Sequence, residues 1–180
     1  MRKLIESTFV TLDGVISSPH VWGPPYWDED HNDYAGKLLF AADALLLGRA
    51  TYEGFAQSWP GRKGDPYADR INSLPKYVAT TSLEEADAWN GTVIQGDVAT
   101  AVAELKRQPG KNILKFGTGE LDRALIANGL VDEFHFWMFP AVAGSGDRLL
   151  DGLDMTHLDL LETTRFKSGI VVLTYGLKGR

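Results

Sequence analysis

The segment Ala44-Leu45-Leu46-Leu47-Gly48-Arg49-Ala50-Thr51 decides the fold class of this chain. A short, continuous apolar run is typical of a strand that is buried on both faces, as in a parallel sheet. Gly48 ends this strand, and Thr51 is placed to cap a short helix that we expect over residues 51–57. A buried strand that passes through glycine into a helix is a building unit of α/β proteins.

The same arrangement recurs at Leu114-Lys115-Phe116-Gly117-Thr118-Gly119. A strand predicted over 112–116 meets glycines and then a helix predicted over 119–128, so backbone amides and a positive helix end would suit a phosphate. Arg49 adds a guanidinium at the first turn. The alternative is that Gly48 is a plain turn residue and Arg49 a surface charge. The second turn has neither the third glycine of a Rossmann motif nor the Gly-Lys-Ser/Thr of a phosphate loop.

The rest of the chain alternates strands with helices and ends in strands alone. Further strands are predicted over 4–10, 76–80, 92–94 and 133–139, and further helices over 31–41, 67–72 and 97–107. Residues 158–166 and 169–177 predict a hairpin with Lys167-Ser168-Gly169 at its tip. We therefore expect one α/β domain over 1–180, a three-layer fold with a mixed, mostly parallel central sheet, helices on both faces and a C-terminal antiparallel hairpin.

Composition narrows the function classes. The 180 residues are 44% hydrophobic and 23% charged, which is ordinary for a globular domain. The net charge is −6 and no dense Lys/Arg cluster occurs, which argues against nucleic acid as a partner. The chain has no cysteine, which excludes thiolate chemistry. Because the N-terminus reaches Glu6 without a long apolar core, and no run approaches the ~18 apolar residues of a membrane helix, we expect a cytoplasmic protein without a signal peptide.

Three consecutive hydroxyl residues, Thr80, Thr81 and Ser82, follow the strand predicted at 76–80. At the carboxyl edge of a parallel sheet they would lie where open α/β proteins bind ligands. Ser82 is also placed to cap a helix-like segment at 83–86 through a capping box with Glu85, and we favour capping for this residue. For Thr80 and Thr81, capping and ligand contact stay open.

Five segments occur in an order that resembles the dihydrofolate reductase-like family: TLDGVI (11–16), LGRATYE (47–53), FGTG (116–119), LVDE (130–133) and PAVAGSG (140–146). The chain is most similar to the riboflavin-biosynthesis reductase branch, the RibD C-terminal type, which often stands alone. The resemblance spans nearly the whole chain. The sequence departs from the family at Thr118, where a Gly-Gly pair is commoner, so this side chain must point away from the phosphates or donate to them.

The resemblance implies an NADPH-binding reductase. Matched motif to motif, Gly48, Arg49 and Thr51 would meet the phosphates, and residues 80–82 would lie beside the adenosine. Residues 117–121 would hold the pyrophosphate, and Thr8 and Phe9 with Ile16 would border the nicotinamide. The full cofactor set is Thr8, Phe9, Ile16, Gly48, Arg49, Thr51, Thr80, Thr81, Ser82, Phe116, Gly117, Thr118, Gly119, Glu120 and Leu121.

The acid-rich segment 22–33 would form the substrate end, as a loop over the nicotinamide. In the folate reductases of this family an acid precedes the Gly-Arg turn by about one helix, and the same spacing counted back from Gly48 lands near Asn32 or Asp33. We choose Asp33 as the catalytic acid. Substrate contacts are expected from Asp13, Trp22, Tyr52 and Phe55, and Asp13 would also shape a turn with Gly14.

The other acids of this segment have a simpler interpretation. Asp28, Glu29 and Asp30 lie in or before the first turn of the next helix, where negative charge is stabilising. A metal site of Asp28, Asp30 and His31 is not expected, because adjacent positions on a helix point apart.

The predicted function is hydride transfer from NADPH to a CH–NH, C=N or C=O group of a small heterocycle. The candidates are a riboflavin-precursor pyrimidine, 5-amino-6-(5-phosphoribosylamino)uracil, or a pterin such as dihydrofolate. The phosphorylated pyrimidine is less favoured, since few basic donors accompany Arg49 (Arg62, Lys63 and Arg148) and no deaminase domain is attached. The alternatives are an NADPH-binding sensor or resistance factor without turnover, and a purely structural module.

A homodimer is also expected. The strand that ends at Phe139 and the strand near 173–177 are the candidates for an unpaired sheet edge that could bind a second copy.

Overall fold

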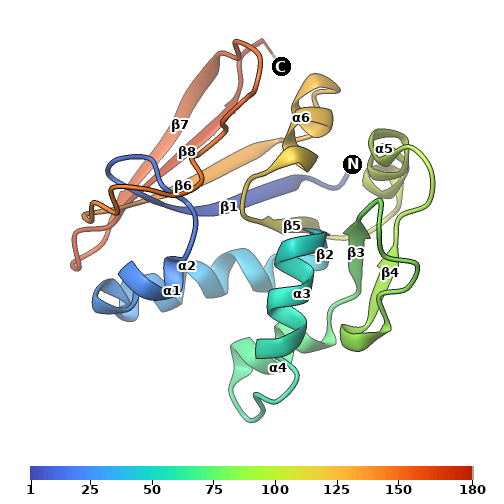
Figure 1. Cartoon of the computed structure of the whole chain (residues 1–180), viewed down its shortest axis with the longest axis horizontal. Coiled ribbons are helices and arrows are strands. Elements are labelled where there is room, and N and C mark those ends of the chain that lie inside the picture. The colour runs from blue at the N-terminus through green and yellow to red at the C-terminus, as the bar shows by residue number, and fades with distance from the viewer. Residues whose placement is uncertain (180) are drawn as a thin grey trace.

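The computed structural model describes residues 1–179 and shows one eight-stranded sheet in the order β4-β3-β2-β5-β1-β6-β8-β7 (Figure 1). The strands are β1 (Leu4–Thr11), β2 (Ala42–Gly48), β3 (Lys76–Ala79), β4 (Gly91–Val93), β5 (Asn112–Phe116), β6 (Glu133–Phe139), β7 (Leu158–Arg165) and β8 (Val171–Leu177). The helices are α1 (Pro19–Trp22), α2 (Glu29–Phe40), α3 (Arg49–Ser58), α4 (Pro66–Ser73), α5 (Val98–Arg107) and α6 (Glu120–Ala127), with the short 3-10 turns η1 (Pro24–Tyr26) and η2 (Asp87–Trp89).

The first six strands run parallel, and the sheet ends in antiparallel strands. β1 lies between β5 and β6 and pairs in parallel with both. β8 pairs antiparallel with β6 and with β7. This confirms the mixed, mostly parallel sheet with a C-terminal hairpin. The predicted edge is wrong, because β6 and β8 each have a strand on both sides; the edges are β4 and β7.

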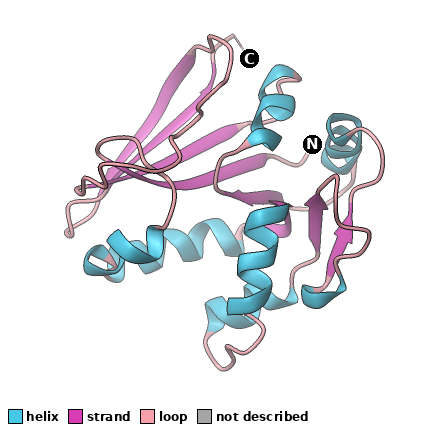
Figure 2. Cartoon of the chain, viewed as in Figure 1, coloured by secondary structure: helices cyan, strands magenta, loops and turns pink. Residues whose placement is uncertain are grey.

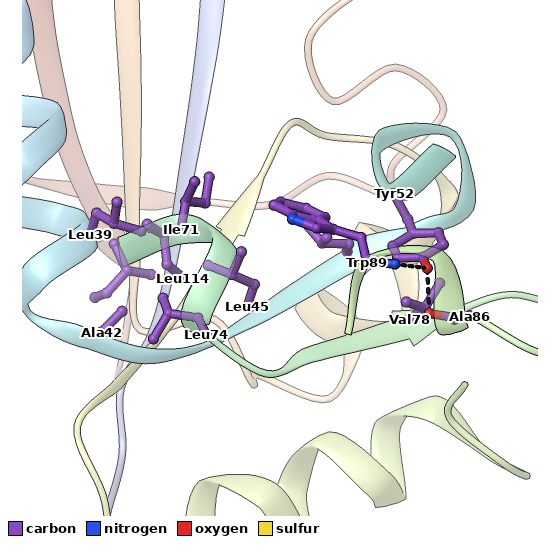
Figure 3. Close-up of a cluster of buried hydrophobic side chains, with 12 residues drawn as sticks. Leu39, Ala42, Leu45, Tyr52, Ile71, Leu74, Val78, Ala86, Trp89 and Leu114 are labelled. Carbon is purple, nitrogen blue, oxygen red and sulfur yellow. Dashed lines mark hydrogen bonds between the residues drawn. The ribbon is translucent and has the colours of Figure 1, made fainter. Parts of the chain in front are cut away.

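Helices cover both faces of the sheet, as expected for a three-layer fold (Figures 1 and 2). The central strand β2 shows why: Leu45 and Leu47 join the core beneath α2, α3 and α4, whereas Leu46 joins the core beneath α5 and α6. Successive side chains of a strand point to opposite faces, so a strand of consecutive leucines needs a helical layer on each side. Figure 3 shows the first of these two cores.

Helix α3 begins earlier than predicted. Gly48 is its N-cap residue, in extended conformation, and Thr51 lies inside the first turn. The expectation that Thr51 caps the helix is therefore wrong. The helices α1 and η1 were not predicted; they start at Pro19 and Pro24, which are tolerated in the first turn where no amide donor is needed. Among residues 1–179, no helix has the length and apolarity needed to cross a membrane.

Candidate functional site

A groove of about 820 Å³ lies at the carboxyl edge of the central strands. Helices from both faces of the sheet begin at this groove, namely α3 from one side and α5 and α6 from the other. Its lining consists of Gly48, Arg49, Ala50, Thr51, Ala79, Thr80, Thr81, Ser82, Ile94, Gly96, Asp97, Val98, Lys115, Phe116, Gly117, Thr118, Gly119, Glu120, Leu121, Asp122 and Ala124. The carboxyl edge of a parallel sheet is the usual ligand site of open α/β proteins.

The N-terminus of α3 opens on this groove without a side-chain cap. By contrast, Asp97 caps α5 by accepting from the Thr100 amide, and Asp122 at the start of α6 accepts from the Gly119 amide at 2.6 Å. A side chain added at Gly48 would meet nothing within 4 Å, so the space in front of the helix is free. Unpaired amides at a positive helix end form a binding site for an anion.

Arg49 lies beside these amides. Its Nη1 donates to Ser82 Oγ at 2.9 Å, and its Nε is 3.9 Å from Glu53 Oε2. Both members of the Arg49–Glu53 pair are about half exposed, so the pair contributes little and leaves the guanidinium able to turn toward an anion.

Residues 80–83 form a turn and not the start of a helix. The hydroxyl of Thr80 accepts from the amides of Ser82 and Leu83, both at 3.1 Å. The predicted capping box of Ser82 with Glu85 is therefore wrong. The hydroxyl of Thr80 competes successfully for the local amides and leaves Ser82 Oγ to accept from Arg49.

The loop after β5 forms the opposite wall. Gly117 has φ +72°, a left-handed conformation that glycine adopts at little cost, and a side chain at Gly119 would meet nothing within 4 Å. Thr118 Oγ1 is buried and has no hydrogen-bond partner among the described residues. Its O–H is therefore available as a donor, and the expectation that this side chain either donates to a phosphate or points away from it stays a prediction.

Three buried ionisable side chains lie beneath this loop. Lys115 Nζ donates to the Gly117 carbonyl and is 2.9 Å from Asp122 Oδ1 and 3.6 Å from Glu6 Oε2. Glu6 is fully buried, and loss of hydration raises its pKa well above the usual value. Lys115 opposes this shift, and Asp122 adds to it. Lys115 and Asp122 thus connect the ends of the loop to each other.

Most of the predicted cofactor residues line the groove; those that do are Gly48, Arg49, Thr51, Thr80, Thr81, Ser82, Phe116, Gly117, Thr118, Gly119, Glu120 and Leu121. Thr8, Phe9 and Ile16 are not in its lining. Thr8 is buried with an unpartnered hydroxyl, and Phe9 packs against Trp137 and Phe139 with centroid separations of 5.1 Å.

The predicted substrate contacts are not brought together. Tyr52 is 3% exposed, and its hydroxyl donates to the Ala86 carbonyl and accepts from the Trp89 amide (Figure 3), so the prediction that it binds substrate is wrong. Phe55 packs against Phe116 and Trp89 in the core beneath α3, and so does not face the groove.

Asp13 and Trp22 hold loops together. Asp13 accepts from the Thr11 hydroxyl and from the amides of Ala143 and Gly144, and these hydrogen bonds, first of all the one from Thr11, lower its pKa to about 2. Gly14 follows with φ +85°, as the turn prediction required. Trp22 Nε1 donates to the Ser17 carbonyl, and its ring meets Phe139 edge-on.

Asp33 is exposed and lies outside the groove lining. The buried side of α2 carries Tyr34, Leu38 and Leu39, and the 100° turn per residue puts Asp33 on the opposite side. The structure does not support Asp33 as the acid. The spacing from Gly48 placed Asp33 on a helix but could not give the face of that helix, which changes with a shift of one residue.

The acids at the start of α2 have structural partners. Asp28 caps the helix through the His31 amide and also accepts from the Ser168 amide, while Asp30 accepts from the Lys167 amide. They therefore dock the β7–β8 turn onto α2. Among residues 1–179 no group of three or more His, Asp or Glu side chains is arranged to hold a metal.

The prediction missed a third strand–glycine–helix turn at the groove. Strand β4 leads to Ile94, then to Gly96 with φ +75°, and Asp97 caps α5. The signal was present, since the order of strand, glycine and helix is the same as at Gly48 and Gly117. Lys115 and Asp122 were also missed, because a lysine within an apolar strand gives no sign of its partner.

The chain belongs to the RibD C-terminal domain family, whose model matches residues 2–172. It is 30% identical over 189 residues to the uncharacterized protein YyaP of Bacillus subtilis, covering 99% of this chain and 96% of that protein.

Solved structures share the fold. A candidate riboflavin biosynthesis protein from Shewanella sp. PV-4 superposes with a TM-score of 0.78 at 21% identity, covering 98% of this chain and 99% of that one. Enterococcus faecalis dihydrofolate reductase, complexed with NADP(H), superposes with a TM-score of 0.60 at 18% identity. The match covers 98% of this chain and 96% of that one. The Thermotoga maritima diaminohydroxyphosphoribosylaminopyrimidine deaminase/5-amino-6-(5-phosphoribosylamino)uracil reductase superposes with a TM-score of 0.67 at 12% identity. The match covers 98% of this chain and 56% of that one.

Proposed function

We propose that this protein is an NADPH-dependent reductase of a small heterocycle of the pyrimidine or pterin class. The observation that carries the proposal is the uncapped N-terminus of α3, which opens on the groove beside Arg49. Family membership supports the reductase class. In a protein of net charge −6, an anionic cofactor must be held by such local donors.

The groove residues fit NADPH chemically. The amides at the start of α3 would hold the pyrophosphate, together with the hydroxyl of Thr118, since the amides of Gly117 and Gly119 already donate to the Ser7 carbonyl and to Asp122. Arg49 and Ser82, already paired at 2.9 Å, offer two donors for a phosphate on the adenosine ribose. NADPH would supply the hydride, and the protein would supply position and exclusion of water.

The charges of the groove also favour a substrate that carries no negative charge of its own. Arg49 is its one exposed cation among the described residues, and the acids Asp97 and Glu120 lie in the same lining. A substrate with its own phosphate would have to compete with the cofactor for Arg49. We therefore propose a heterocycle without a phosphate group.

The test is a titration of the purified protein with NADPH, in which binding is detected by quenching of tryptophan fluorescence and by thermal shift. Binding should raise Tm, since a ligand of the native state stabilises it. Oxidation of NADPH is then followed by absorbance with dihydrofolate, and with aminopyrimidines that either carry or lack a phosphoribosylamino group. Absence of NADPH binding would contradict the proposal.

A second candidate is an NADPH-binding protein without turnover. It is favoured by one observation, the position of Asp33 outside the groove. Tight binding of NADPH without oxidation on any member of the panel would support this candidate over the reductase. The protein would act in the cytoplasm, where NADPH is available, under either candidate.

A further inference from the structure

The buried group Glu6, Lys115 and Asp122 has the geometry of a clamp on the loop 117–119. Lys115 Nζ binds the carbonyl of Gly117, and Asp122 Oδ2 accepts from the amide of Gly119 at 2.6 Å. The two clamping side chains are themselves joined by an ion pair of 2.9 Å. Since all three side chains are at most 3% exposed, this connection is shielded from water.

The two carboxyl groups have too few donors to be ionised together. Lys115 and the Gly119 amide serve Asp122, whereas neither oxygen of Glu6 has a hydrogen-bond donor among the described residues, and the cation nearest to it, Lys115, is 3.6 Å away. An unpaired buried carboxylate is costly, whereas one proton on Glu6 gives it a donor for Asp122. Burial and Asp122 both raise the pKa of Glu6, which agrees with a protonated side chain.

Lys115 is the one cation that faces Glu6 from the strands and helices packed against it in the described part of the chain. The neighbour of Glu6 on β6 is Phe134, and its neighbour on β5 is Lys115. Asp122 is the acidic group that faces it from α6. With the proton on Glu6, the group of three has no net charge. Without it, the group carries one negative charge beneath the loop.

We propose that Glu6, Lys115 and Asp122 act as positioning residues that hold the loop 117–119 open for phosphate, and that the proton on Glu6 sets the affinity of this loop for the anion. The proposal rests on the proposed function, since it requires the groove to bind a phosphorylated nucleotide. Loss of the proton would place a negative charge under the bound phosphate and weaken binding. By linkage, a bound phosphate would raise the affinity of Glu6 for its proton.

The experiment measures Kd for NADPH between about pH 5 and pH 9 in the wild type, E6Q, K115M and D122N. The Kd of the wild type should rise as pH increases through the Glu6 titration, whereas that of E6Q should show only the titration of the 2′-phosphate, near pH ~6. Comparison at equal pH removes this ligand contribution. K115M and D122N should weaken binding by about tenfold or more at all pH values, because each removes a charged hydrogen bond of the clamp.

The matched control is K106M. Lys106 is also 3% exposed and also paired with an aspartate, Asp132, but it lies outside the groove lining. K106M should leave Kd unchanged even if it lowers Tm. Equal Kd profiles for wild type and E6Q, or wild-type binding by a folded K115M, would overturn the clamp.

A second readout needs no variant. In 13C-labelled wild-type protein, the chemical shift of the Glu6 carboxyl carbon should titrate with a midpoint at higher pH than those of the other glutamates. This pH midpoint should move upward when NADPH is added. A midpoint that does not move while NADPH binds would refute the clamp and leave the proposed function intact. If the wild type binds no NADPH at any pH, the proposed function fails, and the clamp fails with it.

Discussion

Under the proposed function, recognition of the cofactor depends on Arg49. It is the exposed cation of the groove and already donates to Ser82. R49Q should raise Kd for NADPH by about ten- to a hundredfold, the range expected when a charged hydrogen bond is lost. The Kd for NADH, which lacks the 2′-phosphate, should change less, because only the additional phosphate depends on Arg49. Equal losses for both cofactors in fluorescence titrations would show that Arg49 does not select the phosphate.

Asp33 serves as the contrasting residue. Its exposed position on the outer side of α2 predicts that D33N retains kcat and KM within about twofold, since exposed substitutions are usually near neutral. A large fall in kcat with unchanged Tm would show that Asp33 is a catalytic residue, and α2 would then have to rotate to bring its side chain to the groove.

Glu133 contributes to the loss of stability that we expect in acid. Its pKa is lowered to about 2, first by the hydrogen bond with His135 and then by Lys3. A carboxyl group with a lowered pKa in the folded state stabilises the protein above its ordinary pKa of about 4.5, and this contribution is lost as pH falls toward 2. E133Q should therefore reduce stability at neutral pH and flatten the dependence between about pH 4.5 and pH 2, measured by urea unfolding. A parallel pH profile in E133Q would contradict this assignment.

At the scale of elements, the interaction between α2 and the β7–β8 turn is open to test. Asp28 bonds both to the His31 amide in α2 and to the Ser168 amide in the turn. D28A should lower Tm by about 2–4 °C, typical of a lost cap in a chain of this length. Exchange of the Lys167 and Ser168 amides should become faster. Unchanged exchange at these two amides would show that the turn is held by other contacts.

Strand positions could be predicted from sequence, whereas side-chain directions on helices could not. β5 and β6 have their predicted bounds because their apolar patterns end sharply at Gly117 and Pro140. Tyr52 and Asp33 were misplaced because the face of a helix depends on its start and its packing. The helix α3 begins at Arg49, and that start follows from the extended Gly48 rather than from any pattern in the helix. The clamp could not be predicted, since its three members come from β1, β5 and α6.

At the scale of the whole molecule, the strand β7 is an exposed edge that could pair with a second copy. It forms one edge of the sheet and exposes Leu160 and Leu161 by 55% and 57%. We propose a homodimer through this edge, and expect light scattering to give twice the monomer mass. The double variant L160K/L161E should be monomeric and should still bind NADPH, because the groove lies at other strands. A monomeric wild type at all concentrations would refute the dimer.

The position of β1 in the sheet also governs how the chain acquires its structure during synthesis. β1 is synthesised long before its partners β5 and β6, so it has no neighbour until residues 112–116 have been made, and its second neighbour is complete only at residue 139. Pairings this distant along the chain slow folding and expose nascent strands to aggregation. The first half of the protein should therefore stay unfolded on the ribosome, in contact with chaperones, and truncations before β6 should give insoluble products.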